Sequence, residues 1–519
     1  MLIKGKALSI NAVILLIVAS VLGVSCKQYK RNASHADVPL SNIREGAVLA
    51  ERYCQSCHQL PDPALLDAKT WETGVLPNMG PRLGIFEYNF LQYPNNRNDR
   101  TLPTDYYPAQ PVLGLLEWQH IIDYYTATSP DSMPGQQRSV SIQLKSEQFK
   151  AVVPKHLYGN PTTSLIKINS RDTGNALFIS DVLRNTAYFF NSNLKVTDSI
   201  THIGSIVDAD VMKDSILLCN IGFLNPNNGK FGKISMINRN DHKGRGLFDS
   251  LQRPVQVTEY DLNNDGRIDY LICAFGYLTG GLYWMENLDG HHFQKHTLRA
   301  LPGAIKAYIQ DYNHDGLPDL WVLFAQGEEG IFLFTNKGNG RFEEQEVLRF
   351  PPVYGSSYFE FADFNHDGYP DILYTCGDNA DYSTILKPYH GVYIFMNDKN
   401  YHFKQSYFFP INGCYKAIAR DFDGDGDLDI ATISFFADYT HQPEEGFVYL
   451  KNNGNLHFQA YTLPEGRSGR WLTMEAGDVN GDGKPDLVLG NFSIGPVTFK
   501  PQIDWKKAPP FLVLKNTGK

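Results

Sequence analysis

Short hydrophobic runs separated by turn residues recur along most of the chain, and this pattern is typical of β-strands rather than of helices. One unit contains an apolar run at Tyr270–Phe275, an aromatic run that opens at Tyr283, an Asn- and Gly-containing turn, and a last run that opens at Phe293. An acidic loop precedes the first of these runs. Together with the segment that leads into the loop, the pattern predicts four strands in each repeat unit.

Five acidic loops share the pattern D-x-[DN]-x-D-G-x-x-D and divide this region into repeats. They begin at Asp261, Asp311, Asp363, Asp421 and Asp478, and successive loops are separated by 50, 52, 58 and 57 positions. A period near 50 residues with strand patterning predicts the blades of a β-propeller.

Two weaker repeats precede the five and raise the expected number of blades to seven. Ile206–Asp210 has the register of an acidic loop without its glycine, and Ala176–Ile179 and Ala187–Phe190 supply strands of a first blade. The last repeat ends at 511–518 without a final strand, whereas Gln148–Pro154 resembles the missing strand. We therefore expect the N-terminal strand to close the ring and to remove a free sheet edge.

The acidic loops have the donor pattern of a calcium site. Alternate side chains supply hard oxygen ligands, the glycine at the sixth position permits a sharp turn, and the closing Asp reaches back from the ninth position. We expect about five Ca²⁺ ions, bound by the following side chains: Asp261, Asn263, Asp265 and Asp269; Asp311, Asn313, Asp315 and Asp319; Asp363, Asn365, Asp367 and Asp371; Asp421, Asp423, Asp425 and Asp429; Asp478, Asn480, Asp482 and Asp486.

This loop pattern resembles the FG-GAP repeats, also called VCBS repeats, of integrin-type propellers. The resemblance implies a seven-bladed, mainly β fold in which calcium pins a hairpin and takes no part in catalysis.

The N-terminal region has a helical pattern instead. Gly46–Tyr53 has helical periodicity, and 113–126 places Leu115, Trp118, Ile122 and Tyr125 on one face. These stripes predict a small all-α domain with its own core.

The first helix of this domain runs into Cys54-Gln-Ser-Cys57-His58, a C-x-x-C-H motif. In this motif two thiols bond covalently to haem vinyl groups, and the adjacent His binds the iron. The segment resembles the attachment site of c-type cytochromes, which implies covalent haem c. A structural or thioredoxin-like C-x-x-C is the alternative interpretation.

Few residues can supply the second axial ligand of such a haem. Met79 lies in a loop fixed by Pro77, Gly80 and Pro81, which resembles the ligand loop of monohaem cytochromes c. Met133, His120 or an open sixth position are the alternatives. The long insertion 84–110 either covers the haem edge or docks on the propeller.

The chain begins as an exported protein does. Basic residues precede an apolar run at 12–24 that is too short to span a bilayer, and the run ends at Cys26 in a sequence that resembles a bacterial lipobox. We expect lipidation of Cys26 and a lipoprotein anchored at the outer membrane, on its periplasmic or its surface face. The expected segments are a signal peptide at 1–25, a linker at 26–43, a cytochrome c domain at 44–134 and the propeller at 135–519.

The net charge bears on the class of partner, and the remaining cysteines bear on disulfide formation. A net charge of -9 without a basic run argues against a nucleic-acid partner. Cys219, Cys273, Cys376 and Cys414 are expected to be buried thiols, with disulfides as the alternative.

The sequence therefore predicts a haem c electron-transfer lipoprotein whose propeller docks an unidentified redox partner or surface ligand. A propeller dehydrogenase that reduces its own haem, and a surface binding or adhesion module without a redox role, are the alternatives; no catalytic residue is assigned. Lys306 and Lys416 both stand five positions before a loop Asp. We expect both at the mouth of the central channel, on the face opposite the acidic loops. An acidic or carbohydrate-like ligand could bind there; alternatively, the two lysines only pack loops.

Overall fold

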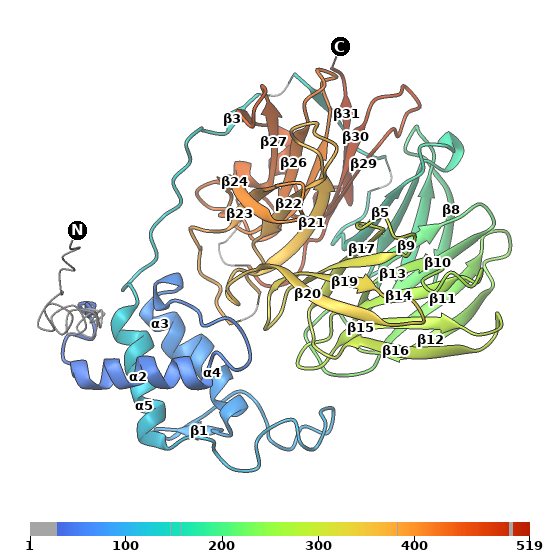
Figure 1. Cartoon of the computed structure of the whole chain (residues 1–519). Coiled ribbons are helices and arrows are strands. Elements are labelled where there is room, and N and C mark those ends of the chain that lie inside the picture. The colour runs from blue at the N-terminus through green and yellow to red at the C-terminus, as the bar shows by residue number, and fades with distance from the viewer. Residues whose placement is uncertain (1–28, 146, 156, 381, 498–501, 519) are drawn as a thin grey trace, which may run out of the picture.

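The computed structural model describes residues 29–145, 147–155, 157–380, 382–497 and 502–518. The predicted signal peptide and Cys26 lie outside the described residues. The chain forms a small helical region followed by a seven-bladed β-propeller, so the expected mainly β architecture is confirmed. Figure 1 shows the helices to one side of the ring of blades.

The helical region is built on two packed helices, α2 (Leu40–Tyr53) and α5 (Leu115–Thr128). They approach closely at Gly46, where an added Cβ would lie 1.8 Å from the carbonyl oxygen of His120. Shorter elements lie between them: η1 (Pro63–Leu65), α3 (Ala68–Thr70), η2 (Trp71–Val75), α4 (Leu76–Met79), η3 (Gly80–Leu83), β1 (Glu87–Tyr88) and β2 (Leu91–Gln92).

The buried face of α5 differs from the predicted one. Leu115 is 58% exposed, whereas Trp118, Ile121 and Tyr125 are buried. The helix begins at Leu115 because Glu117 accepts a hydrogen bond from the backbone N–H of Gly114, 2.6 Å away, and so caps the first turn. Leu115 therefore lies in the first turn, outside the core.

Blades 1 to 5 are four-stranded antiparallel sheets whose strands are consecutive in the chain. Blade 1 contains β5 (Thr163–Ile168), β6 (Leu177–Asp181), β7 (Thr186–Phe190) and β8 (Val196–Thr201). Blade 2 contains β9 (Ile206–Val211), β10 (Ser215–Asn220), β11 (Gly232–Asn238) and β12 (Gly244–Leu251). Blade 3 contains β13 (Pro254–Tyr260), β14 (Asp269–Ala274), β15 (Gly281–Asn287) and β16 (Phe293–Arg299).

The remaining blades repeat this plan. Blade 4 contains β17 (Ala304–Gln310), β18 (Asp319–Phe324), β19 (Gly330–Asn336) and β20 (Phe342–Arg349). Blade 5 contains β21 (Ser356–Ala362), β22 (Asp371–Cys376), β23 (Gly391–Asn397) and β24 (Phe403–Pro410). Blade 6 contains β25 (Cys414–Arg420), β26 (Asp429–Ser434), β27 (Phe447–Asn452) and β28 (Phe458–Thr462), and blade 7 contains β29 (Trp471–Gly477), β30 (Asp486–Asn491) and β31 (Phe511–Asn516).

The N-terminal strand closes the ring, as predicted. β4 (Phe149–Val152) pairs antiparallel with β31 and becomes the fourth strand of blade 7. A two-residue strand that was not predicted, β3 (Gln143–Leu144), adds parallel to β28 at the edge of blade 6. The ends of the propeller are thus tied to each other by hydrogen bonds between segments far apart in the sequence.

The prediction of a degenerate acidic loop at Ile206–Asp210 is wrong. These residues belong to β9, and Asp208 pairs with Cys219 as Gln256 pairs with Cys273 in blade 3. Without a glycine in this segment the chain has no residue suited to the sharp turn, so it remains extended. The expected blade count is unaffected.

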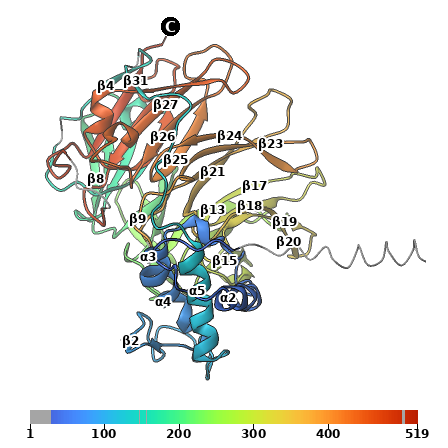
Figure 2. The ribbon, with the colours of Figure 1, turned by 90° about the vertical axis from the view of Figure 1, so that its left-hand side faces the viewer.

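Figure 2 shows the helical region against one end of the propeller. Its hydrogen bonds to links between second and third strands place it at the end opposite the acidic loops. The Tyr106 hydroxyl donates a hydrogen bond to the Leu278 carbonyl at 3.0 Å, and the Tyr389 hydroxyl donates one to the Leu65 carbonyl at 3.0 Å. Leu278 and Tyr389 belong to links between the second and third strands of their blades. Val353 also packs against the helical core. The predicted insertion 84–110, which contains Tyr106, therefore docks on the propeller.

Candidate functional site

The C-x-x-C-H motif stands at the C-terminal end of α2. Cys54 caps the helix through a backbone hydrogen bond to Ala50, and its side chain is half-buried, whereas Cys57 is exposed. His58 places Nδ1 2.9 Å from the backbone carbonyl of Gln59, which leaves Nε2 as the nitrogen for a metal. This arrangement fits the demands of haem c: two nearby thiols and an imidazole oriented through its other nitrogen.

Burial sets the protonation of these groups. It raises the pKa of the Cys54 thiol to about 12, with a further contribution from Cys57. It also lowers the pKa of His58, and the guanidinium groups of Arg349 and Arg82 lower it further. His58 is therefore neutral at pH 7, as an iron ligand must be. Arg349 ends β20, so the motif lies beside the propeller.

The three candidates for a sixth ligand lie in different surroundings. Met79 ends α4 and packs, half-buried, against the same core cluster as Cys54. His120 is buried within α5, with Nδ1 3.3 Å from a carboxylate oxygen of Glu45. Met133 lies in an irregular segment after α5. Met79 shares a core with the attachment motif and stays our predicted ligand.

Each acidic loop joins the first and second strands of blades 3 to 7. The first Asp accepts a hydrogen bond from the N–H of the glycine at the sixth position, at 2.8 Å in the loop of Asp261. This glycine takes a left-handed conformation, with φ of 83° at Gly266 and 98° at Gly426. The turn that the sequence pattern requires is therefore present.

The closing Asp of each loop is fully buried and binds backbone rather than solvent. Asp269 accepts hydrogen bonds from the N–H groups of Leu262, at 3.1 Å, and Asn287, at 2.8 Å. The same two bonds recur in the other loops, at Asp319, Asp371, Asp429 and Asp486. Each of these carboxylates thus connects the loop to the end of the third strand.

An asparagine at the end of each third strand completes the connection. The Asn287 amide donates to the Ile268 carbonyl at 2.9 Å, and its oxygen accepts from the N–H of Gly290 at 2.6 Å. Equivalent residues are Asn336, Asn397, Asn452 and Asn516. From the sequence we predicted only an Asn- and Gly-containing turn at this position. The recurrence of Asn in five repeats could have indicated its structural role.

Among the acidic loops, the loop of blade 6 brings three carboxylates close enough together for a cation site. One ligand oxygen each from Asp421, Asp423 and Asp429 lies within 4.8 Å of the others, a spacing that a divalent ion can bridge. Burial raises the pKa of Asp429 to about 7, although the Tyr449 hydroxyl opposes this shift. A bound cation would favour the ionised form and remove that penalty.

Cationic side chains already contact some of these carboxylates. Lys451 contacts Asp423, and Lys399 lies 3.4 Å from Asp367. Each would therefore compete with a metal ion for its loop.

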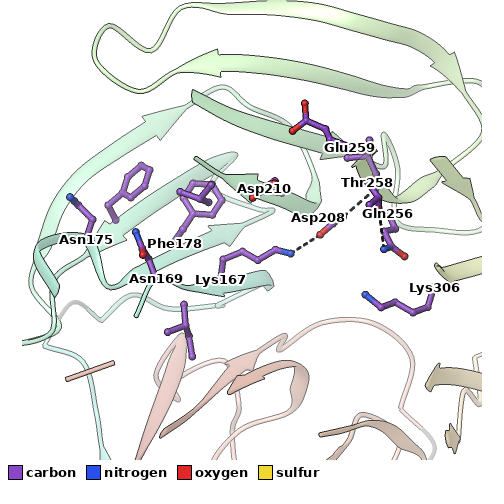
Figure 3. Close-up of a pocket in the computed structure, with 15 residues that line it drawn as sticks. Lys167, Asn169, Asn175, Phe178, Asp208, Asp210, Gln256, Thr258, Glu259 and Lys306 are labelled. Carbon is purple, nitrogen blue, oxygen red and sulfur yellow. Dashed lines mark hydrogen bonds and ion pairs between the residues drawn. The ribbon is translucent and has the colours of Figure 1, made fainter. Parts of the chain in front are cut away.

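Lys306 and Lys416 occupy equivalent positions on the inner strands, each directly after a β-bulge, as the predicted offset requires. The Lys416 ammonium donates to the Met474 carbonyl at 2.7 Å and lies 3.6 Å from Glu475. The Lys306 ammonium instead lies 4.9 Å from the centre of the Tyr308 ring. Lys306 also borders a cavity (Figure 3).

Cys219, Cys273, Cys376 and Cys414 are free and buried, so the expected thiols are confirmed and the alternative of disulfides among them is wrong.

No helix within the described residues is both long and apolar enough to cross a bilayer.

Comparisons with known proteins match the propeller. The FG-GAP-like repeat family matches residues 261–322 and 311–374, and the FG-GAP repeat family matches residues 471–493. Human integrin alpha-6 is 29% identical over 159 residues, which are 28% of this chain and 14% of that protein. The chain therefore spans a small part of the curated relative that it matches.

Solved structures are similar to this chain only at low identity and low TM-score. A streptogramin B lyase is 12% identical with a TM-score of 0.44, covering 71% of this chain and 98% of that one. A dihydro-haem d1 dehydrogenase, NirN, is 10% identical with a TM-score of 0.35, covering 86% of this chain and 84% of that one. From the sequence matches, the propeller carries FG-GAP repeats related to those of an integrin α chain.

Proposed function

We propose that this chain is an exported haem c electron-transfer lipoprotein whose calcium-stabilised propeller docks a redox partner or a surface ligand. The observation that carries the proposal is the C-x-x-C-H motif at the end of α2, in which the Gln59 carbonyl orients His58 and leaves Nε2 available. Bound haem would supply a one-electron change at iron.

The chain's own residues would hold and tune that group. Cys54 and Cys57 would attach it, and His58 and Met79 would ligate the iron. Arg82 and Arg349 lie close enough to His58 to lower its pKa, so their positive charges would also favour the reduced over the oxidised iron. The aromatic core around Trp71 and Tyr125 keeps this side of the site dry.

Calcium would stabilise the propeller, and a lipid anchor would hold the protein at a membrane. About five Ca²⁺ ions would bind the acidic loops and offset the repulsion between their carboxylates. Acyl chains on Cys26 would hold the protein at the outer membrane, on the periplasmic or the surface face.

The absorption spectrum of full-length protein from a strain that attaches haem tests the redox proposal. We expect a Soret band and a reduced low-spin spectrum, both lost in the double variant Cys54→Ser, Cys57→Ser. Met79→Ala should lose the sulfur-ligated signal, while Met133→Ala, the matched control, keeps it. Purified protein without a Soret band would overturn the proposal.

A surface binding or adhesion module without redox function is the second candidate. The FG-GAP match and the likeness to an integrin α chain favour it, because both concern the propeller alone. Full activity of a haem-free variant in binding its surface ligand would support this candidate over the first.

A further inference from the structure

A cavity of about 340 Å³ opens at the central channel, where the inner strands of blades 1 to 4 meet. It lies at the end of the channel that carries the acidic loops, since its walls include the last residues of β5, β9 and β13. Blades 1 and 2 have no acidic loop at this end. The helical region docks on the opposite end, so it leaves the cavity open.

Two lysines point into this cavity, but only one is neutralised. Figure 3 shows Lys167 and Lys306 reaching toward the same space from different blades. The Lys167 ammonium is 2.9 Å from a carboxylate oxygen of Asp208. Within the described part of the chain Lys306 forms no ion pair, and its ammonium has only the rings of Tyr308, at 4.9 Å, and Tyr358, at 5.9 Å.

Lys306 therefore lacks the counter-charge that a half-buried ammonium needs. Burial lowers the pKa of Lys306, and the positive charges of Lys416 and Lys167 lower it further, although Asp208 opposes them. An anionic group of a ligand would supply the missing charge and a charge-assisted hydrogen bond.

The rest of the wall suits hydroxyl groups. The carboxylates of Asp210 and Glu259 line the cavity and form no ion pair within the described residues, so they can accept hydrogen bonds from a ligand. Phe178 and Phe189 lie behind this wall as core side chains, 2% and 3% exposed. The volume is at the lower end of the range for small-molecule sites.

We propose that this cavity binds a small hydroxylated carboxylate, such as a sugar acid. Lys306 binds the carboxylate, and Asp210 and Glu259 accept hydrogen bonds from hydroxyls. The site does not depend on haem or on the proposed electron transfer.

Calorimetric titration of the full chain with D-glucuronate, D-glucose and D-glucosamine tests this site. We expect glucuronate to bind more tightly than glucose, and glucosamine not to exceed glucose. Lys306→Met should weaken glucuronate binding roughly ten- to a hundredfold and leave glucose unchanged, because it removes one charge-assisted hydrogen bond.

Lys295→Met is the matched control, since the Lys295 ammonium also lies over a tyrosine ring, 3.4 Å from the centre of Tyr283, but on the outer strand β16. It should bind glucuronate as the parent does. Lys306→Gln replaces Lys306→Met if the latter fails to fold, as judged by circular dichroism. Equal binding of glucose and glucuronate, tighter binding of glucosamine, or unchanged glucuronate binding in a folded Lys306 variant would overturn the proposal.

Discussion

Blades 3 to 7 differ from blades 1 and 2 in how the first strand is connected to the second. In blades 3 to 7 the first two strands are joined by an acidic loop whose closing Asp is buried and bonded to backbone. In blade 2 a short turn suffices, closed by the hydrogen bond from Met212 N–H to the Ser215 carbonyl at 3.0 Å. In blade 1 Asp172 caps a 3₁₀ turn through the N–H of Gly174.

The difference teaches that the blade itself does not require an acidic loop. A short turn makes the connection without clustered carboxylates, and it leaves room at the channel for the cavity beside Lys306. If calcium binds as we propose, the acidic loops add stability that depends on ions, whereas blades 1 and 2 provide open polar surface.

Removal of calcium should give the largest effect, because it acts on all five loops. With calcium at a hundred times its Kd, each site should contribute about 2.7 kcal/mol to the free energy of unfolding. We expect chelation by EGTA to lower the melting temperature measured by circular dichroism, and added Ca²⁺, not Mg²⁺, to restore it. An unchanged melting temperature would refute metal binding by these loops.

Asp429→Ala should give the next largest effect. The substitution removes the hydrogen-bond acceptor of the Phe422 N–H, the Asn452 N–H and the Tyr449 hydroxyl. Each buried donor left without an acceptor costs roughly 1–3 kcal/mol. We expect a loss of about 3–5 kcal/mol in urea denaturation. Asp214→Ala, in the exposed turn of blade 2, should change stability by no more than about 0.5 kcal/mol. If Asp429→Ala and Asp214→Ala lose similar free energy of unfolding, the proposed difference between the acidic loops and the short turn of blade 2 is wrong.

The metal-free protein should lose stability as the pH rises through neutrality. Burial raises the pKa of Asp429 to about 7, above its value of 3.8 in an exposed setting. The folded state therefore binds the proton more tightly, and this contribution is present at low pH and is lost as pH rises through about 7. In EGTA, the urea midpoint should be higher at pH 6 than at pH 8.

Asp429→Asn is the control, because it cannot ionise and should reduce the difference between these two pH values. A difference of the same size in that variant would assign the pH dependence to other groups.

Lys451→Met should have the smallest effect. Lys451 contacts Asp423, so its ammonium competes with calcium at the loop of blade 6. Removing one exposed charge is worth about 1 kcal/mol, and we expect about fivefold tighter calcium binding at that loop by calorimetry. Lys404→Met, on the exposed side of β24, should leave the affinity unchanged.

Features with local sequence signals were predictable. The acidic loops and their glycines are contiguous motifs, so their place between first and second strands follows from strand patterning on both sides. Ring closure was also predictable, because the last repeat lacked a strand that Phe149 and its neighbours resembled.

Features that depend on distant contacts were not predictable. Tyr106 and Leu278 are 172 positions apart, and Tyr389 and Leu65 are 324 apart, and each pair meets through a backbone carbonyl that has no sequence signature. Asp208 was misplaced because its spacing from Asp210 imitates a loop. The pattern of hydrophobic residues also placed Leu115 wrongly on the buried face of its helix, because the pattern does not show at which residue the helix begins.

The pairing of β4 with β31 determines when the ring of blades can close during synthesis of the chain. β4 leaves the ribosome before any blade, yet its partner strand β31 follows the strands of blades 1 to 6, so β4 must wait unpaired while six blades assemble. Its length of four residues and the water-facing Lys150 make it a poor template for other chains during that delay. A nascent chain that lacks β31 should therefore leave β4 unpaired and the ring of blades open.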